Sequence, residues 1–167
     1  TADGHDYIII GLDFNIGASC FGAYVREKIT DKNSEYFGLW KYYLVKEGFG
    51  FDTYDVIQKI INLYPKKKVE FFPDASGNNR STNASQSDIA IIREAGFKVD
   101  APLQNGAVRD RVISTNTLFS QGRLFINSTT CPNSANGFKS QGYNKKGEPE
   151  KYEDHQYETQ CSCNQLL

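Results

Sequence analysis

The sequence predicts an α/β fold in which helices flank a mixed β-sheet. Three observations favour this class: a buried strand near the N-terminus, two strand-like segments that follow closely, and alternating helical and strand-like segments thereafter. Closely spaced strands predict an antiparallel meander, whereas strands separated by helices predict parallel pairing. Because 167 residues suit a single domain, residues 1–167 are expected to form one.

The first three expected strands lie in the N-terminal third of the chain. Residues 7–13 are almost continuously β-branched, aromatic or otherwise apolar, which is typical of a central strand covered on both faces. Residues 19–27 and the aromatic-rich residues 37–46 are the next two strands, and the polar residues 31–34 supply the turn between them.

Helices and strands then alternate. Residues 52–64 place apolar side chains on one helical face, and Pro65 ends that helix. Turn residues and hydrophobic spacing predict the remaining elements. In chain order these are a strand over 69–73, a loop over 76–87, a helix over 88–95, a strand over 97–101, a helix over 106–120, a strand over 122–126, a helix within 128–141, a charged loop over 144–151 and a closing helix from 152.

Composition excludes several classes of function. A net charge of -1 argues against a uniformly basic DNA-binding surface, but it leaves room for a basic stripe and an acidic metal site. No apolar run approaches the roughly 20 residues of a membrane-spanning helix, so no membrane partner is expected. The Cys161-Ser-Cys163 spacing does not support a zinc site. Because the chain contains no Met, we expect it to be a domain cut from a longer polypeptide.

Two aspartates end predicted central strands. Asp13 closes the first strand, and Asp74 follows the strand over 69–73. The carboxyl ends of such strands meet at one edge of the sheet, where open α/β sheets bind ligands. Adjacent carboxylates repel each other unless a cation lies between them, and magnesium and manganese prefer oxygen ligands. Two such ions about 4 Å apart activate a water and stabilise the leaving oxygen in phosphodiester hydrolysis.

A third acidic ligand is expected from the closing helix. Asp154, His155 and Glu158 are the candidates, and the spacing of three places His155 and Glu158 on one helical face. Taken singly, each residue has an ordinary structural interpretation: an aspartate caps a helix, a glutamate is solvated, and a histidine packs at the surface. The functional interpretation therefore rests on the ordered combination with Asp13 and Asp74.

Four stretches of the chain, in order, resemble one known family. They are Gly11-Leu-Asp-Phe-Asn15, Pro73-Asp-Ala-Ser-Gly77, the pair of segments 109–112 and 119–125, and Gly147-Glu-Pro-Glu-Lys151 leading into 154–158. Together they are similar to the C-terminal nuclease domain of phage terminase large subunits. The resemblance covers nearly the whole chain.

This resemblance implies a ribonuclease H-like fold and a metal-dependent endonuclease that acts on double-stranded DNA. It implies a role in cutting concatemeric viral genomes during packaging, in the host cytoplasm. It also implies an ATPase domain earlier in the same chain, with the small terminase subunit and the portal as further partners. This piece has no glycine-rich phosphate loop with Lys and Ser/Thr, so it is not expected to hydrolyse ATP.

The resemblance also implies roles for individual residues. Asp13, Asp74 and Glu158 would hold two Mg²⁺ or Mn²⁺ ions, and His155 would orient a ligand, a water or the scissile phosphate. The family usually carries Asp where this chain has Glu158, which is one methylene longer. Asp154 is therefore the alternative third ligand.

Basic residues near the acidic stretches are candidate DNA contacts. They are Arg80, Arg109, Arg111 and Lys151. A nuclease without strict sequence preference needs mainly phosphate contacts, so its binding is expected to weaken as salt rises.

Three alternatives remain open at this point. Residues 10–15 also resemble the first phosphate loop of actin-like and sugar-kinase ATPases, although those proteins need two lobes and a longer chain. A non-catalytic ribonuclease H-like module that binds nucleic acid or protein would lack tight dependence on magnesium or manganese. A junction resolvase or transposase of the same fold would share the chemistry and differ in substrate.

Overall fold

The computed structural model describes residues 2–14, 19–78, 86–142 and 145. Six strands lie in this part of the chain: β1 Tyr7–Asp13, β2 Ser19–Lys28, β3 Trp40–Gly50, β4 Lys68–Pro73, β5 Lys98–Val99 and β6 Leu124–Ile126. The helices are α1 Thr53–Leu63, α2 Asp88–Glu94, α3 Val108–Ser120 and α4 Pro132–Ser140, with a short 3₁₀ turn, η1, at Ala75–Asn78.

The strands form one mixed sheet in the order β5-β4-β1-β2-β3-β6. β1, β2 and β3 pair antiparallel, as the predicted meander requires. β4 pairs parallel with β1, and β5 pairs parallel with β4. The predicted mixed sheet is therefore confirmed. β6 pairs parallel with β3 at the other edge, so the last strand joins the meander instead of extending the β4 side.

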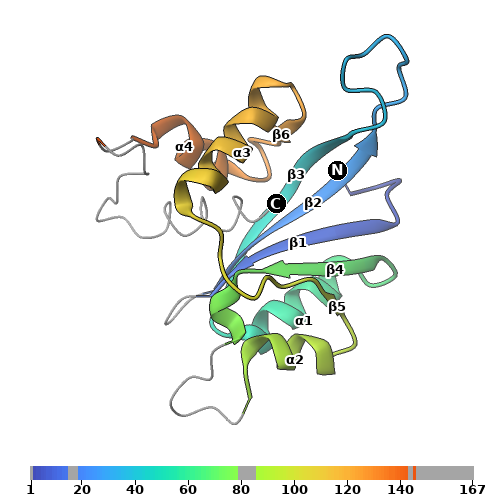
Figure 1. Cartoon of the computed structure of the whole chain (residues 1–167). Coiled ribbons are helices and arrows are strands. Elements are labelled where there is room, and N and C mark those ends of the chain that lie inside the picture. The colour runs from blue at the N-terminus through green and yellow to red at the C-terminus, as the bar shows by residue number, and fades with distance from the viewer. Residues whose placement is uncertain (1, 15–18, 79–85, 143–144, 146–167) are drawn as a thin grey trace.

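The helices cover the sheet from two sides (Figure 1). α1 and α2 pack on one face, here called the α1 face, around buried residues that include Ile8, Ile10, Leu12, Val56, Ile60 and Ile92. α3 and α4 lie on the opposite side, the α3 face, whose buried residues are Ile9, Tyr24, Leu44, Leu124 and Cys131. Alternate residues of β1 thus point to different cores, which explains its continuous apolar sequence.

Local signals set the ends of the first helix. The Asp52 side chain accepts a hydrogen bond from the Asp55 backbone N–H at 2.8 Å and so caps α1. Tyr64 ends the helix and Pro65 follows it. The helix predicted over 52–64 is confirmed, and so are the helices predicted over 88–95 and 106–120 and within 128–141.

The start of the third strand differs from the prediction. Residues 34–39 form turns instead of the start of a strand, with Phe37 N–H donating to the Ser34 carbonyl at 3.0 Å. Gly38 adopts a φ of 83°, which favours glycine, and its N–H donates to the Ile29 carbonyl. β3 therefore begins at Trp40 and runs on to Gly50. The aromatic side chains of this stretch resemble a strand in composition, but the glycine bends the backbone.

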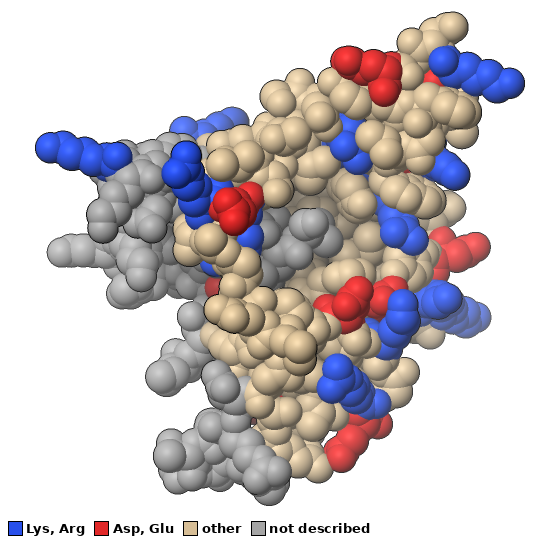
Figure 2. Space-filling view, viewed as in Figure 1, with Lys and Arg blue, Asp and Glu red and all other residues tan. Residues whose placement is uncertain are grey.

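Charges of both signs are spread over the surface seen in Figure 2, in keeping with the net charge of -1. Within the described part of the chain, no helix is long and apolar enough to cross a membrane.

Candidate functional site

Asp13 and Asp74 lie side by side at the carboxyl ends of two neighbouring strands. β1 and β4 run parallel in register, with Leu12 opposite Pro73. The Asp74 backbone N–H donates to the Leu12 carbonyl at 3.0 Å, so the ladder reaches as far as the acidic pair. The structure therefore brings together the two aspartates that the sequence analysis singled out.

Two side chains hold the Asp74 carboxylate in place. The Ser76 hydroxyl donates to Oδ1 at 2.7 Å, and the Asn105 amide donates to Oδ2 at 3.2 Å. The side-chain oxygen Oδ1 of Asn105 accepts a hydrogen bond from the Ala75 N–H at 2.7 Å. Asn105 therefore binds both the Asp74 carboxylate and the backbone of the next residue. Asp74 itself is only 9% exposed. Metal-ligating carboxylates usually have such hydrogen-bond donors behind them, and their remaining lone pairs stay available to a cation.

A close contact links the two acidic motifs. A Cβ atom at Gly77 would lie 2.2 Å from Cε2 of Phe14, so only glycine lets the Phe14 ring lie against this turn. Phe14 follows Asp13 directly and packs against the α1 face. The Phe of the first motif and the Gly of the second thus fit against each other, and their contact helps to hold the two aspartates together.

Two further acidic or ionisable groups adjoin Asp13 on the sheet. Cys20 is the cross-strand partner of Asp13, and Glu47 on β3 is the partner of Gly22. Burial raises the pKa of the Cys20 thiol to about 12, and the carboxylates of Asp13 and Glu47 add to this shift. The thiol therefore stays protonated at neutral pH and is not a nucleophile here.

The first turn of α3 begins just after Asn105. It carries Arg109, which is exposed, and Arg111, which is half-buried. The Nε atom of Arg111 is buried without a hydrogen-bond partner. Asn105 donates a hydrogen bond to Asp74, so the loop that leads into α3 is attached to the acidic pair. Arg109 and Arg111 lie on the helical turn that follows this loop.

Five predicted site residues lie outside the described residues: Arg80, Lys151, Asp154, His155 and Glu158. Within residues 2–14, 19–78, 86–142 and 145, no group of three or more His, Cys, Asp or Glu side chains is arranged to hold a metal ion. The described part of the chain thus supplies two of the carboxylates of the predicted centre, and the choice between Asp154 and Glu158 stays a prediction.

Sequence reasoning missed Asn105 and Glu47. Asn105 is 31 residues from Asp74, and no local spacing connects the two. A signal did exist for Ser76, which lies two residues after Asp74 and makes the side-chain hydrogen bond that Asp-x-Ser spacing permits.

Comparison with known proteins gave matches among solved structures alone. No family model and no curated protein matches the chain. The large terminase of the thermophilic bacteriophage D6E, in complex with ATP-γ-S, superposes with a TM-score of 0.66 at 17% identity over 96% of this chain. The P22 large terminase nuclease domain gives a TM-score of 0.62 at 14% identity, covering 96% of this chain and 78% of that one. The SPP1 large terminase nuclease domain with bound Mn gives 0.61 at 17% identity, covering 98% and 85%.

This is the fold of the phage large terminase nuclease domains. The predicted ribonuclease H-like architecture is confirmed, with its antiparallel meander followed by parallel strands. The chain spans 39% of the length of the D6E large terminase, so it corresponds to one part of that protein.

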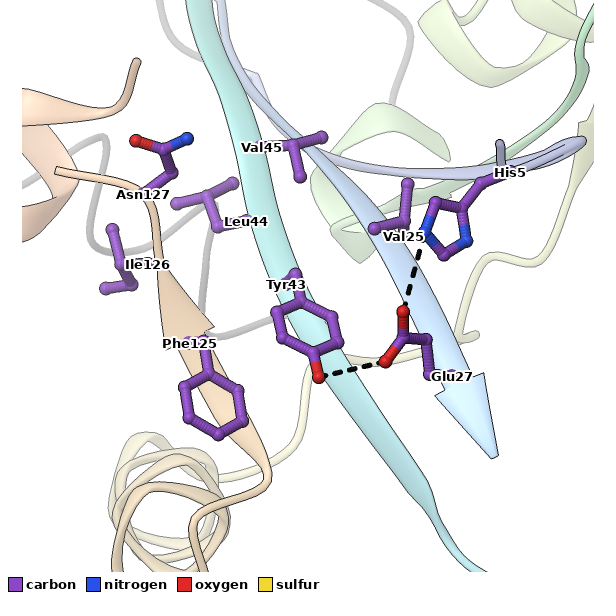
Figure 3. Close-up of a pocket in the computed structure, with 9 residues that line it drawn as sticks. All are labelled: His5, Val25, Glu27, Tyr43, Leu44, Val45, Phe125, Ile126 and Asn127. Carbon is purple, nitrogen blue, oxygen red and sulfur yellow. Dashed lines mark hydrogen bonds and ion pairs between the residues drawn. The ribbon is translucent and has the colours of Figure 1, made fainter. Parts of the chain in front are cut away.

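The described part of the chain also has a pocket away from the acidic pair. This cavity of about 350 Å³ lies over β2, β3 and β6, and Figure 3 shows its lining. At its rim the Tyr43 hydroxyl donates to Glu27 at 3.0 Å, and His5 lies 3.7 Å from the same carboxylate. Phe125 stacks on Tyr43. No residue that lines this pocket belongs to the candidate site.

Proposed function

We propose that this chain is the nuclease domain of a large terminase and hydrolyses double-stranded DNA with divalent metal ions. One observation carries the proposal. Asp13 and Asp74 stand together at the carboxyl ends of β1 and β4, in a fold shared with terminase nuclease domains. The parallel β1–β4 ladder places the two aspartates, and the Asp74 carboxylate accepts hydrogen bonds from Ser76 and Asn105.

The residues at this edge fit a metal centre. Carboxylate oxygens suit Mg²⁺ and Mn²⁺, and a buried, hydrogen-bonded aspartate is typical of a ligand. Asp13 and Asp74, with Glu158 or Asp154 as the third carboxylate, would hold two such ions. When bound, the ions supply an activated water and stabilise the leaving oxygen of the phosphodiester. The SPP1 nuclease domain with bound Mn supports this choice of metals.

The other residues position the substrate and the carboxylates. Ser76 and Asn105 keep the Asp74 oxygens oriented. His155 orients a water or the scissile phosphate. Arg109 and Arg111, on the first turn of α3, bind backbone phosphates, and Arg80 and Lys151 do likewise from the flanking segments.

In the cell, this activity would cut concatemeric viral DNA during genome packaging in the host cytoplasm. An ATPase domain in the same chain would drive the DNA, and the D6E large terminase bound to ATP-γ-S supports this arrangement. The small terminase subunit and the portal complete the proposed set of partners.

The test is cleavage of supercoiled plasmid by the purified domain in Mg²⁺ or Mn²⁺, with EDTA as the blank. We expect nicking and linearisation that Asp13→Asn and Asp74→Asn abolish. Asp100→Asn is the matched control, because Asp100 follows the next strand outward, β5, and is exposed. It should cut like the wild type. Between Asp154→Ala and Glu158→Ala, the inactive variant identifies the third ligand.

A second readout separates a nuclease from a binding module. Calorimetric titration with Mn²⁺ should show binding that Asp74→Asn weakens, without any need for turnover. A well-folded wild-type domain that neither binds Mn²⁺ nor cuts DNA in either metal contradicts the proposal and favours a non-catalytic module.

A further inference from the structure

An arginine on the α3 face is stacked between two aromatic rings. The guanidinium carbon of Arg26, on β2, lies 4.4 Å from the Trp40 ring centroid and 4.8 Å from that of Tyr7. The two rings come from the strands on either side of β2, namely β3 and β1. Contact with an aromatic ring on either side restricts the orientation of the guanidinium and leaves its N–H donors available to an acceptor.

The donors of Arg26 are not used within the protein. Among the described residues, the Arg26 side chain makes no hydrogen bond and no ion pair. Within the described part of the chain, Arg111 Nε is the one buried side-chain nitrogen or oxygen without a hydrogen-bond partner. The unpartnered nitrogen atoms of Arg26 are therefore not buried. The guanidinium donors of Arg26 therefore face solvent, held in place by the rings but without an acceptor.

A second cation stands beside this stack. Lys68 is exposed on β4, and its ammonium nitrogen lies 6.0 Å from the centroid of the same Tyr7 ring that contacts Arg26. The nearby carboxylate of Glu70 forms an ion pair with Lys98 at 2.5 Å and accepts a hydrogen bond from the Tyr7 hydroxyl. The order across the four adjacent strands β4, β1, β2 and β3 is thus Lys68, Tyr7, Arg26 and Trp40. Figure 2 shows basic and acidic side chains interspersed along the side where these strands have their far ends.

The stacked arginine shares a sheet face with the acidic pair. Cys20, the cross-strand partner of Asp13, lies six residues before Arg26 on β2, so both point to the α3 face. At 3.3 Å per strand residue the two positions are roughly 20 Å apart. One DNA strand carries a phosphate about every 3.4 Å of helix axis, so this span matches about six phosphate steps.

We propose that Lys68 and the stacked Arg26 form a second phosphate-binding site for duplex DNA, at the far end of the face that carries Asp13 and Asp74. This inference rests on the proposed nuclease function, since the DNA is the substrate cut at the acidic pair. The rings of Tyr7 and Trp40 hold the guanidinium so that it binds phosphate without losing further side-chain freedom. The site contacts backbone phosphates and reads no base sequence.

The test measures binding of a fluorescein-labelled mixed-sequence duplex by anisotropy, in Ca²⁺ to prevent cleavage, over a series of NaCl concentrations. Arg26→Ala and Lys68→Ala are each expected to weaken binding and to lower the slope of log affinity against log salt by about one. Arg26→Lys should keep the slope. Arg93→Ala removes the same charge from exposed α2 on the opposite face and should leave both quantities unchanged.

Cleavage kinetics provide an independent readout. Arg26→Ala should raise KM for plasmid and leave kcat unchanged, because the site binds DNA away from the reacting phosphate. Lys68 is exposed, so Lys68→Ala decides the matter if Arg26→Ala fails to fold. If a folded Arg26→Ala or Lys68→Ala variant has the salt slope and the KM of the wild type, this proposal is overturned. The proposed nuclease function still holds in that case, provided that cleavage depends on Asp13. A wild-type domain that neither binds nor cuts DNA overturns both.

Discussion

Glu47, buried on β3, accepts hydrogen bonds from both the backbone N–H and the hydroxyl of Ser134, at 2.8 and 2.5 Å. Its other oxygen accepts the Asn133 N–H at 2.8 Å. These donors belong to the first turn of α4, where a negative charge is favourable because unpaired N–H groups point outward from the helix end. Glu47 of the meander thus anchors α4 through Ser134, which lies 87 residues further along the chain.

Removing this carboxylate should destabilise the domain. Glu47→Ala leaves two backbone donors and a hydroxyl of α4 without their acceptor in a buried place, so we expect a loss of about 1–3 kcal/mol in the free energy of unfolding. Urea denaturation followed by circular dichroism measures it. Glu94→Ala, at an exposed position near the end of α2, should change stability by less than about 0.5 kcal/mol. Equal effects of the two variants would contradict this account.

Metal affinity should depend on Asn105. Asn105→Ala removes the donor to Asp74 Oδ2 and the acceptor of the Ala75 N–H, so the carboxylate loses its fixed orientation. Outer hydrogen-bond partners of metal ligands typically contribute about 10–100-fold to metal affinity or activity. We expect the Mn²⁺ concentration for half-maximal cleavage to rise within that range.

Asn116→Ala serves as the matched control for Asn105→Ala, since Asn116 is exposed on α3. Its metal requirement and melting temperature should equal those of the wild type. A wild-type Mn²⁺ requirement in folded Asn105→Ala would show that Asp74 needs no support from this side.

Substitution at Gly77 should disturb the acidic pair through Phe14. The added methyl of Gly77→Ala would lie 2.2 Å from the Phe14 ring, which must move, and Phe14 is joined directly to Asp13. We expect lower thermal stability and slower cleavage. Phe14→Leu in the same chain makes room, so the double variant should recover part of both losses, as a double-mutant cycle measures. Additive losses in the double variant would refute the contact as the cause.

Stability should fall in alkaline solution because buried acids keep their protons in the folded state. Burial raises the pKa of Tyr64 from its ordinary 10.0 to about 12 and that of Cys20 from 9.0 to about 12. The folded chain then binds more protons than the unfolded chain between these values, so stability is fully present below about pH 9 and declines as the pH rises toward 12.

Tyr64→Phe isolates one of these groups. It keeps the ring, which is 8% exposed, and removes the ionising hydroxyl. The decline in urea midpoint above pH 10 should therefore be shallower than in the wild type. Tyr54→Phe, at a residue 60% exposed, should follow the wild-type curve. Parallel pH curves for wild type and Tyr64→Phe would count against the role of Tyr64.

Local patterns were enough to predict much of the fold. The apolar run of β1, the capped helix α1 and the aspartates that end β1 and β4 all depend on residues close together in sequence. The three-strand meander followed from short connections. These signals placed Asp13 and Asp74 at one edge because parallel neighbours end on the same side of a sheet.

Contacts between distant segments were not predictable in the same way. The hydrogen bonds from Asn105 to Asp74 and from α4 to Glu47 form only when separate elements pack together. The sequence around Asn105 or Glu47 does not indicate which residue it will bind. The pairing of β6 with β3 is of the same kind. The missed turn at 34–39 had a different cause, since aromatic composition there outweighed the single signal of Gly38.

The attachment of α4 has a consequence for how the domain behaves in concentrated solution. β6 covers the outer edge of β3 only along Tyr42–Leu44. Just beyond, the start of α4 meets the strand, with the Cys131 thiol 3.7 Å from the Leu44 carbonyl and Ser134 bound to Glu47. Unpaired strand edges recruit strands from other molecules. Among the residues that the structure describes, β3 is the longest strand, and detachment of α4 would expose the part of its edge that this helix covers. Glu47, which binds the helix, therefore also limits edge-to-edge aggregation.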